Sequence, residues 1–251
     1  MGSDRSGVVY VIAKAPRAGA AKTRLCPPLQ PAQAAGLAAA FLLDTLETVQ
    51  RAGLAARAIC RDARERAALA RLLRDAAAIT VQRGRGLGAA LDSAFRAGFD
   101  AGFAAVGVLG ADIPTLPAAV VRQAFTTVAN GADVALGPSE DGGYYLLVAR
   151  RRHPELFRNM TWSTASVARV TLERCRELGL RTAMLPRWYD VDDAAALDRL
   201  EAELAASPSD VAPHTRTALA GRRVEEPRPR RTRKRRSGRY DGRAPLTGQG
   251  W

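Results

Sequence analysis

The stretch that decides the fold is Val8-Val9-Tyr10-Val11-Ile12-Ala13, which continues into Lys14-Ala15-Pro16-Arg17-Ala18-Gly19-Ala20-Ala21-Lys22-Thr23-Arg24-Leu25. The first six residues are apolar and largely β-branched, which is typical of a strand that is buried on both faces. The next twelve contain a proline, a glycine and four cations, which indicates a loop. A buried strand that ends in a basic loop is an arrangement by which α/β proteins hold phosphates.

Beyond this stretch, strand-like and helix-like segments alternate with short joins, which predicts a sheet covered by helices. Strands are expected at residues 7–13, 54–60, 78–82, 104–109, 132–137, 144–149 and 181–185. Helices are expected at residues 31–51, 63–75, 88–101, 117–129, 164–178 and 193–205. Asp141-Gly142-Gly143 separates two strands with no helix between them, so this pair is expected to be tightly joined and antiparallel or splayed. The predicted fold class is α/β, a single domain with a mixed, mostly parallel sheet.

Composition and length agree with one globular domain, which we place at residues 7–221. The chain has 251 residues, of which 47% are apolar and 25% are charged. No apolar run reaches the 18 residues of a membrane span and no signal-peptide pattern is present, so a cytoplasmic protein is expected. Cys26, Cys60 and Cys175 are odd in number and widely spaced, which predicts free thiols and neither a disulfide framework nor a zinc site.

The net charge of +13 is concentrated in residues 222–251. That segment contains 11 Arg/Lys and 3 Asp/Glu, or +8, which leaves +5 for residues 1–221. Because it lacks apolar periodicity, the tail is expected to be disordered, as are residues 1–6. Its function is expected to be solubilisation, with nonspecific contact to nucleic acid as the alternative.

The first loop is a candidate diphosphate site. Only three lysines occur in the chain, and two of them, Lys14 and Lys22, lie in this loop. With Arg17 and Arg24 they supply positive charge, while Gly19 permits close approach of the backbone. The loop is not a Walker A motif, because Ala21 and not a glycine stands immediately before Lys22, and because Pro27 and Pro28 prevent a long helix.

Carboxylates after the strands are candidate metal ligands. Asp112 follows the strand that ends at Leu109-Gly110, at the edge of the sheet where open α/β proteins bind ligands. It is a candidate ligand of Mg²⁺ or Mn²⁺, with a helix cap as the alternative. Asp190 and Asp192 are two residues apart, so on an extended segment they could face the same way and provide a second metal contact, for which Asp192 is the candidate. Asp193 is most simply a helix N-cap.

The turn Glu140-Asp141-Gly142-Gly143 is a candidate substrate site. Its glycines, Gly142 and Gly143, allow a substrate to approach the backbone, and Asp141 could act as a catalytic base, although a plain hairpin turn explains the sequence equally well. His153 and His214 are the only histidines in the sequence and lie outside these motifs. A Ser-His-Asp or Cys-His mechanism therefore lacks a plausible base.

Five motifs together resemble the family of selenodomain-associated transferase 1, also called an arsenosugar-biosynthesis glycosyltransferase. They span about residues 7–205 and read Ala13-Lys14-Ala15-Pro16-x-x-Gly19-x-x-Lys22-Thr23-Arg24-Leu25, Gly110-Ala111-Asp112-x-Pro114, Gly137-Pro138-x-x-Asp141-Gly142-Gly143-Tyr144-Tyr145, Trp162-Ser163-Thr164 and Asp190-Val191-Asp192. The resemblance implies the glycosyltransferase A-type, Rossmann-like fold of nucleotide-diphospho-sugar transferases. It also implies a first loop that binds nucleotide and Asp112 on the metal. With these we expect Lys22 and Asp141 in catalysis and Asp192 as a second metal ligand. The residues expected to bind nucleotide are Lys14, Pro16, Gly19, Lys22, Thr23, Arg24 and Gln82. Those expected to bind substrate are Gly142, Gly143, Tyr144 and Trp162.

The chain departs from this family in one motif. Family members often carry Gln-x-Gly-x-Asp-Leu-Gly-x-Arg, whereas this chain reads Gln82-Arg83-Gly84-Arg85-Gly86-Leu87-Gly88-Ala89-Ala90. The aspartate of that motif is replaced by Gly86 and its arginine by Ala90. If the missing groups read the base or bind the acceptor, this chain has a different preference, and Arg83 and Arg85 could bring charge to an anionic ligand.

Two reactions fit these residues. The favoured one is glycosyl transfer from a nucleotide sugar to a small-molecule acceptor, and the alternative is nucleotidyl transfer from a nucleoside triphosphate. A third hypothesis is a noncatalytic protein that binds RNA or another anion through the basic tail.

Overall fold

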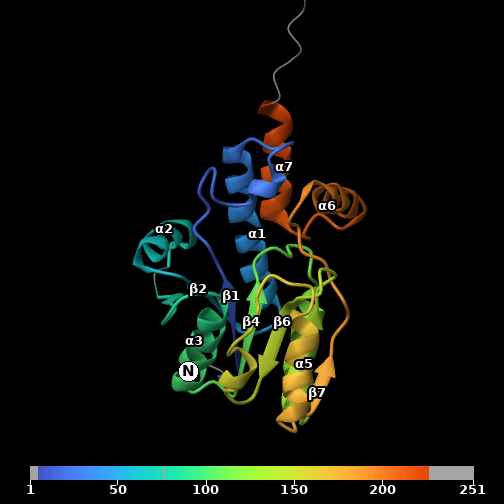
Figure 1. The fold of residues 1–251 in the computed structure, drawn as a ribbon. Helices are drawn as coiled ribbons and strands as arrows, with labels where there is room; N and C mark the ends of the chain where they lie inside the picture. Colours follow the sequence, from blue (N-terminus) through green and yellow to red (C-terminus); the bar gives the residue numbers. More distant parts are fainter. Residues whose placement is uncertain (1–4, 76, 226–251) are drawn as a thin grey trace, which may run out of the picture.

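Seven strands form one mixed sheet in the computed structural model, which describes residues 5–75 and 77–225. The strands are β1 (Gly7–Ile12), β2 (Ala55–Cys60), β3 (Ile79–Val81), β4 (Ala105–Gly110), β5 (Val134–Pro138), β6 (Tyr144–Ala149) and β7 (Thr182–Met184). They lie in the order β3-β2-β1-β4-β6-β5-β7 (Figure 1). Only β6 runs against its neighbours, pairing antiparallel with β4 and β5. The predicted α/β fold with a mixed, mostly parallel sheet is therefore confirmed, and the Asp141–Gly143 turn joins an antiparallel pair.

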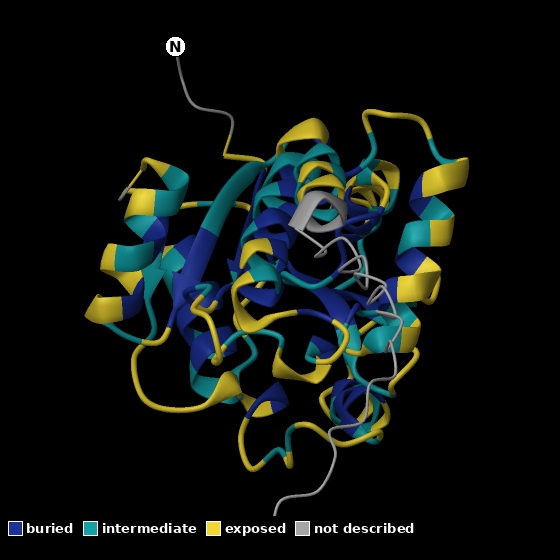
Figure 2. Cartoon of the chain, turned by 90° about the horizontal axis from the view of Figure 1, so that it is seen from above, coloured by how far each residue is buried: buried dark blue, intermediate teal, exposed yellow. Residues whose placement is uncertain are grey.

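Helices cover both faces of the sheet. They are α1 (Pro31–Arg51), α2 (Ala63–Leu73), α3 (Leu87–Asp100), α4 (Ala118–Ala129), α5 (Val167–Glu177), α6 (Ala194–Ala206) and α7 (Pro213–Glu225), with short 3₁₀ helices η1 (Thr23–Leu25) and η2 (Pro154–Leu156). Leu42, Leu69 and Phe125 of α1, α2 and α4 belong to the core on one face. Phe95 and Cys175 of α3 and α5 belong to the core on the other. Seen from above, the strands are buried between helices whose outer faces are exposed (Figure 2).

A third core lies at the carboxyl edge of the sheet and fixes the loops there. Leu25 from η1, Phe41 from α1 and Leu200 from α6 are each fully buried in it. Burial of one such side chain contributes about 1.5–3 kcal/mol. The segment between η1 and α1 and the segment before α6 are therefore held against the same helix.

Helix α7 was not expected from the sequence. It begins at Pro213 and packs beside α1 (Figure 1). Asp44 of α1 caps its first turn by accepting hydrogen bonds from the backbone N–H groups of His214 and Thr215, at 3.0 and 2.8 Å. Because α7 continues to Glu225, the expected boundary between domain and tail at residue 221 falls inside a helix.

Other expectations fall partly outside the described residues. Residues 1–4 and 226–251 are not described, so their expected disorder and a nucleic-acid role for the tail stay predictions, whereas the disorder expected of residues 222–225 is wrong because they belong to α7. The three cysteines are free thiols, as predicted. Within the part of the chain that the structure describes, no helix is sufficiently long and apolar to cross a bilayer.

Candidate active site

Four segments far apart in the sequence meet at the edge where the parallel strands end. The loop after β1 and Asp112 after β4 lie there, and so does the turn before β6, because that strand starts from this edge. The fourth segment precedes α6. Its Val191 N–H donates to the Asp112 carbonyl at 2.9 Å, and the Trp188 carbonyl accepts from the Glu140 N–H at 2.9 Å. This is the edge at which open α/β sheets bind ligands.

Lys22 is the centre of this arrangement. Its ammonium lies 2.8 Å from Asp112 Oδ2 and 2.6 Å from Asp192 Oδ1. It also donates to the Val191 carbonyl at 2.7 Å, and the side chain is 8% exposed. The Lys22 backbone is left-handed, with φ 50° and ψ 42°. A non-glycine residue in this region costs about 1–2 kcal/mol, so the three contacts of the ammonium are what retain the conformation.

Negative charge accumulates around Lys22. The pKa of Asp190 is raised to about 6, chiefly because burial disfavours its charged form. The neighbouring charges of Asp141, Asp112 and Asp192 raise this pKa further, while a hydrogen bond with Ser139 opposes the shift. Among the side chains of residues 5–75 and 77–221, Lys22 is the one cation that forms an ion pair with any of these four carboxylates.

The chemistry of these carboxylates is that of the ligands in sites for hard divalent cations. Carboxylate oxygens are the ligands that Mg²⁺ and Mn²⁺ prefer, and Asp112, Asp190 and Asp192 gather more negative charge than one ammonium neutralises. Lys22 now supplies the positive charge between Asp112 and Asp192, the two carboxylates predicted to bind metal. Their role as metal ligands stays a prediction.

A second group with metal-ligand chemistry lies between α1 and α7. Asp44, Glu47 and His214 bring their ligand atoms within 4.8 Å of one another. Asp44 is 2% exposed, and its two carboxylate oxygens already accept the bonds that cap α7, including one from the Thr215 hydroxyl at 2.6 Å. His214 Nε2 lies 2.9 Å from Glu47. These contacts explain the group as the attachment of α7 to α1.

The remaining cations of the first loop face solvent. Lys14, Arg17 and Arg24 are exposed, and their side chains form no hydrogen bond or ion pair with any described residue. Gly19 is exposed in a left-handed conformation, with φ 75° and open space around it. Thr23 is also exposed and lies with Arg24 in η1, while Pro16 is half-buried. Because η1 is a three-residue 3₁₀ helix, the rejection of a Walker A motif is confirmed.

Asp141 lies in the turn between β5 and β6. Its side chain is exposed and accepts a hydrogen bond from the Gly143 N–H at 2.8 Å. Gly142 has φ 90°, and a Cβ at this position would lie 2.2 Å from the Ala165 carbonyl oxygen. The carbonyl of Gly142 accepts from the Ala168 N–H at 3.0 Å. A glycine is therefore required for the segment before α5 to pack against this turn.

Three predicted site residues do not join the carboxylates. The Tyr144 hydroxyl is buried beside Cys175 without a hydrogen-bond partner in the described structure, and burial raises its pKa. The Gln82 amide donates to the carbonyls of Gly84 and Gly86, at 2.9 and 3.3 Å, and so shapes the loop before α3. Trp162 lies against Gly88 at the start of α3. Nucleotide or substrate binding by these residues stays a prediction.

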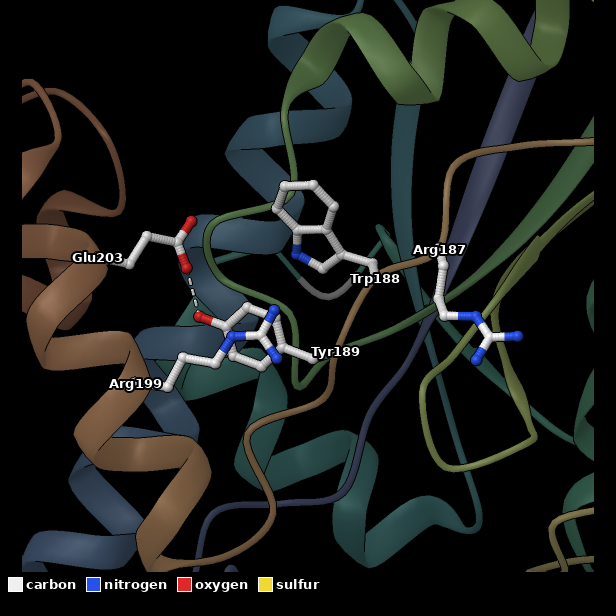
Figure 3. Close-up of a pocket in the computed structure, with 5 residues that line it drawn as sticks. All are labelled: Arg187, Trp188, Tyr189, Arg199 and Glu203. Atoms are coloured by element: carbon white, nitrogen blue, oxygen red, sulfur yellow. Dashed lines mark hydrogen bonds between the residues drawn. The ribbon is translucent and has the colours of Figure 1, made fainter.

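A hollow of about 320 Å³ lies beside the segment that precedes α6. Figure 3 shows Arg199 stacked on Tyr189, at 3.8 Å from its ring centroid, while Arg187 points away. Arg199 also donates to Glu140 at 2.8 Å, and the Tyr189 hydroxyl donates to Glu203. Since Arg199, Glu140 and Glu203 already have partners, this hollow offers little free charge to a ligand.

The sequence did not indicate that Lys22 would bond the predicted metal ligands. It did single Lys22 out, because lysine is rare in this arginine-rich chain. The contribution of Ser139, which forms a hydrogen bond with Asp190, was missed. A serine inside a turn carries no sequence signal for such a contact.

Comparisons with known proteins support the fold. A family described as an uncharacterized protein conserved in bacteria (DUF2064) matches residues 45–164, just under half of the chain. No curated protein matches the chain. A crystal structure from Desulfovibrio desulfuricans G20, provisionally described as a nucleotide-diphospho-sugar transferase, is 29% identical with a TM-score of 0.78 and covers 87% of this chain and 97% of that one.

Two more distant structures share the fold. CMP:2-keto-3-deoxy-manno-octonic acid synthetase in complex with CTP is 15% identical with a TM-score of 0.52, over 80% of this chain and 99% of that one. A nucleotidyl transferase from Methanothermobacter thermautotrophicus is 17% identical with a TM-score of 0.54, over the same shares. The fold is thus that of nucleotide-diphospho-sugar transferases. None of these matches names the selenodomain-associated family, which stays an expectation.

Proposed function

We propose that this protein is a metal-dependent transferase that moves a sugar from a nucleotide sugar to a small-molecule acceptor. The observation that carries the proposal is the contact of Lys22 with Asp112 and Asp192, beside a loop whose other cations are unpaired. A site that combines grouped carboxylates with free cations suits a diphosphate and a divalent cation together. The likeness in fold to the Desulfovibrio protein supports the same class of reaction.

The first loop would bind the donor. Lys14, Arg17 and Arg24 are free to form charge-assisted hydrogen bonds with the diphosphate, and the open space around Gly19 lets it approach the backbone. Asp112, with Asp192, would hold Mg²⁺ or Mn²⁺, which when bound neutralises charge on the phosphates. The Lys22 ammonium would carry positive charge beside these carboxylates. Once this ammonium moves off Asp112 and Asp192, it would hydrogen-bond a phosphate oxygen of the donor.

The acceptor reaction would use Asp141 as the base. The acceptor oxygen forms a bond to the anomeric carbon of the sugar, and the bond from that carbon to the β-phosphate oxygen breaks. The nucleoside diphosphate leaves with the electron pair of that bond. The acceptor hydroxyl gives its proton to the Asp141 carboxylate, which is exposed and bonded only to the Gly143 N–H among the described residues.

The experiment measures which small molecule leaves the donor. The full chain is incubated with Mn²⁺ and each of a panel of nucleotide sugars and nucleoside triphosphates, after a thermal-shift screen selects those that stabilise it. Release of a nucleoside diphosphate from a nucleotide sugar, absent in Asp112→Asn, supports glycosyl transfer. Release of pyrophosphate from a triphosphate would replace the proposal with nucleotidyl transfer. No stabilisation by any nucleotide would reject both.

A further inference from the structure

A groove of about 380 Å³ lies between the start of α3 and the segment that links β6 to α5. Its volume is in the range of small-molecule sites. One wall begins at Arg85 and Leu87, and the other includes Phe157, Arg158 and Trp162.

The two walls are held in place by contacts across the groove and behind it. Arg152 makes a two-pronged ion pair with Asp92 of α3, at 2.9 and 2.8 Å. Behind the second wall, Arg174 of α5 donates to the carbonyls of Leu156 and Asn159, at 3.0 and 3.2 Å. The groove is therefore formed before any ligand arrives.

Its lining combines free positive charge with apolar surface. The guanidinium groups of Arg85 and Arg158 are exposed, and neither forms a hydrogen bond or ion pair with a described residue. Leu87 is 39% exposed, and Met160 and Trp162 are half-buried in the same groove. Arginine binds phosphate and carboxylate through paired donors, and the apolar residues suit a hydrocarbon or ring.

One residue that lines the groove belongs to the segment that contacts the turn of the proposed base. Trp162 is three residues before Ala165, whose backbone lies against Gly142, next to Asp141. Because α3 follows β3 and begins at the carboxyl edge, the groove and the turn lie at the same edge of the sheet. The free cations of the first loop lie on another segment and remain available for the donor.

We infer that this groove binds the acceptor, and that the acceptor carries a phosphate or carboxylate group on an apolar body. The acceptor role rests on the proposed function, whereas the binding chemistry follows from the groove alone. Arg85 and Arg158 hold the anionic group, and Leu87, Met160 and Trp162 contact the apolar part. The hydroxyl that reacts is then directed toward Asp141.

The test uses phenyl phosphate as the probe, with inorganic phosphate and benzyl alcohol as comparators that each lack one half of it. Binding to the full chain is measured by ligand-observed NMR titration. Phenyl phosphate is expected to bind more tightly than either comparator. Arg158→Gln should weaken that binding about tenfold, since it removes a charge-assisted hydrogen bond. Arg151→Gln is the control, because Arg151 is exposed on the same segment but does not line the groove.

Several results would overturn the inference. They include equal binding of either comparator, unchanged affinity in Arg158→Gln, and displacement of phenyl phosphate by a nucleoside diphosphate with Mn²⁺. The last would make the groove part of the donor site. Nucleotide binding without phenyl phosphate binding would reject the groove alone. Phenyl phosphate binding without nucleotide binding would reject the proposed function and with it the acceptor role.

Discussion

Lys22 and Asp192 are 170 residues apart in the sequence, yet a 2.6 Å ion pair joins them at the edge of the sheet. The lysine comes from the loop after the first strand, and the aspartate lies just before α6. The same ammonium contacts Asp112, so one side chain connects three of the four segments that build the site. We therefore expect Lys22 to influence how these carboxylates respond to a cation.

Replacement of Lys22 by methionine should make stability depend on divalent cations. Without the ammonium, Asp112 and Asp192 lose their positive partner, and we expect the free energy of unfolding to fall by about 1–3 kcal/mol. Mg²⁺ or Mn²⁺ should restore much of this loss, because it replaces the missing charge. The measurement is thermal unfolding with and without cation. Lys14→Met, which removes an exposed and unpaired lysine, should show neither effect, and a cation-independent Lys22→Met would contradict the metal assignment.

Asp112→Asn should remove the effect of the cation on nucleotide binding. The amide is a weaker ligand than a carboxylate and carries no charge, so we expect at least a tenfold loss in Mn²⁺-dependent affinity for a nucleoside diphosphate, or about 1.4 kcal/mol. Isothermal titration calorimetry of a nucleoside diphosphate, with and without Mn²⁺, measures this affinity. Asp100→Asn, an exposed change at the end of α3, is the matched control. Equal Mn²⁺ dependence in Asp112→Asn and the parent chain would reject Asp112 as a ligand.

Gly142→Ala should disturb the turn that carries Asp141. The new Cβ would lie 2.2 Å from the Ala165 carbonyl oxygen, and its φ of 90° is unfavourable for alanine. We expect a loss of about 2–4 kcal/mol in stability and a displaced turn. Gly19→Ala separates backbone strain from the steric clash, because Gly19 has φ 75° but no atom of the described residues lies within 4 Å of a Cβ at this position, and it should cost only about 1 kcal/mol. Chemical denaturation compares the two variants, and equal losses would show that the clash is relieved without cost.

Asp133 should make the protein sensitive to acid. Its pKa is lowered to about 2, first by the hydrogen bond from the Arg181 N–H and then by bonds from the side chains of Arg150 and Arg181. Because the pKa is lower in the folded chain than the usual 3.8, this stability is complete above about pH 4 and is lost as the pH falls toward 2. We expect about 1 kcal/mol, reduced by partial exposure to solvent.

Denaturation of Asp133→Asn between pH 2 and 6 tests this prediction. The variant should be less stable than the parent chain above pH 4, and the difference should narrow as the pH falls. Asp75→Asn is the control, since among the described residues Asp75 bonds only to the backbone N–H groups of Ala77 and Ala78. A difference that stays constant over the whole pH range would show that the ionised carboxylate of Asp133 is not the source.

The central elements of the fold could be predicted because their information is local. The run from Val8 to Ile12 is apolar enough to indicate a buried strand, and α1 shows its helical spacing through Leu37, Phe41 and Val49, which are all buried. Asp193 was expected to cap α6 and does so, by accepting a hydrogen bond from the Ala196 N–H at 2.9 Å.

What could not be predicted depends on distant partners. Helix α7 takes its cap from Asp44, some 170 residues earlier, so the capping contact at its start cannot be read from the residues around Pro213. The inward turn of Lys22 requires a left-handed backbone that lysine seldom adopts. The acceptor groove depends on Arg152 meeting Asp92 across 60 residues. In each case the side chains can be read from the sequence, but the contact between them cannot.

The contact between Lys22 and Asp192 also implies an order in which parts of the fold can form during synthesis: the centre of the sheet before the edge where these two residues meet. The ribosome makes the basic loop about 170 residues before Asp192, and this carboxylate emerges only after β7 has been made. Until then the strands at the centre of the sheet can pair, while Lys22 lacks Asp192 and the Val191 carbonyl. A nascent chain that stops before Asp190 would therefore keep the middle of the sheet but leave the ligand-binding edge unfinished.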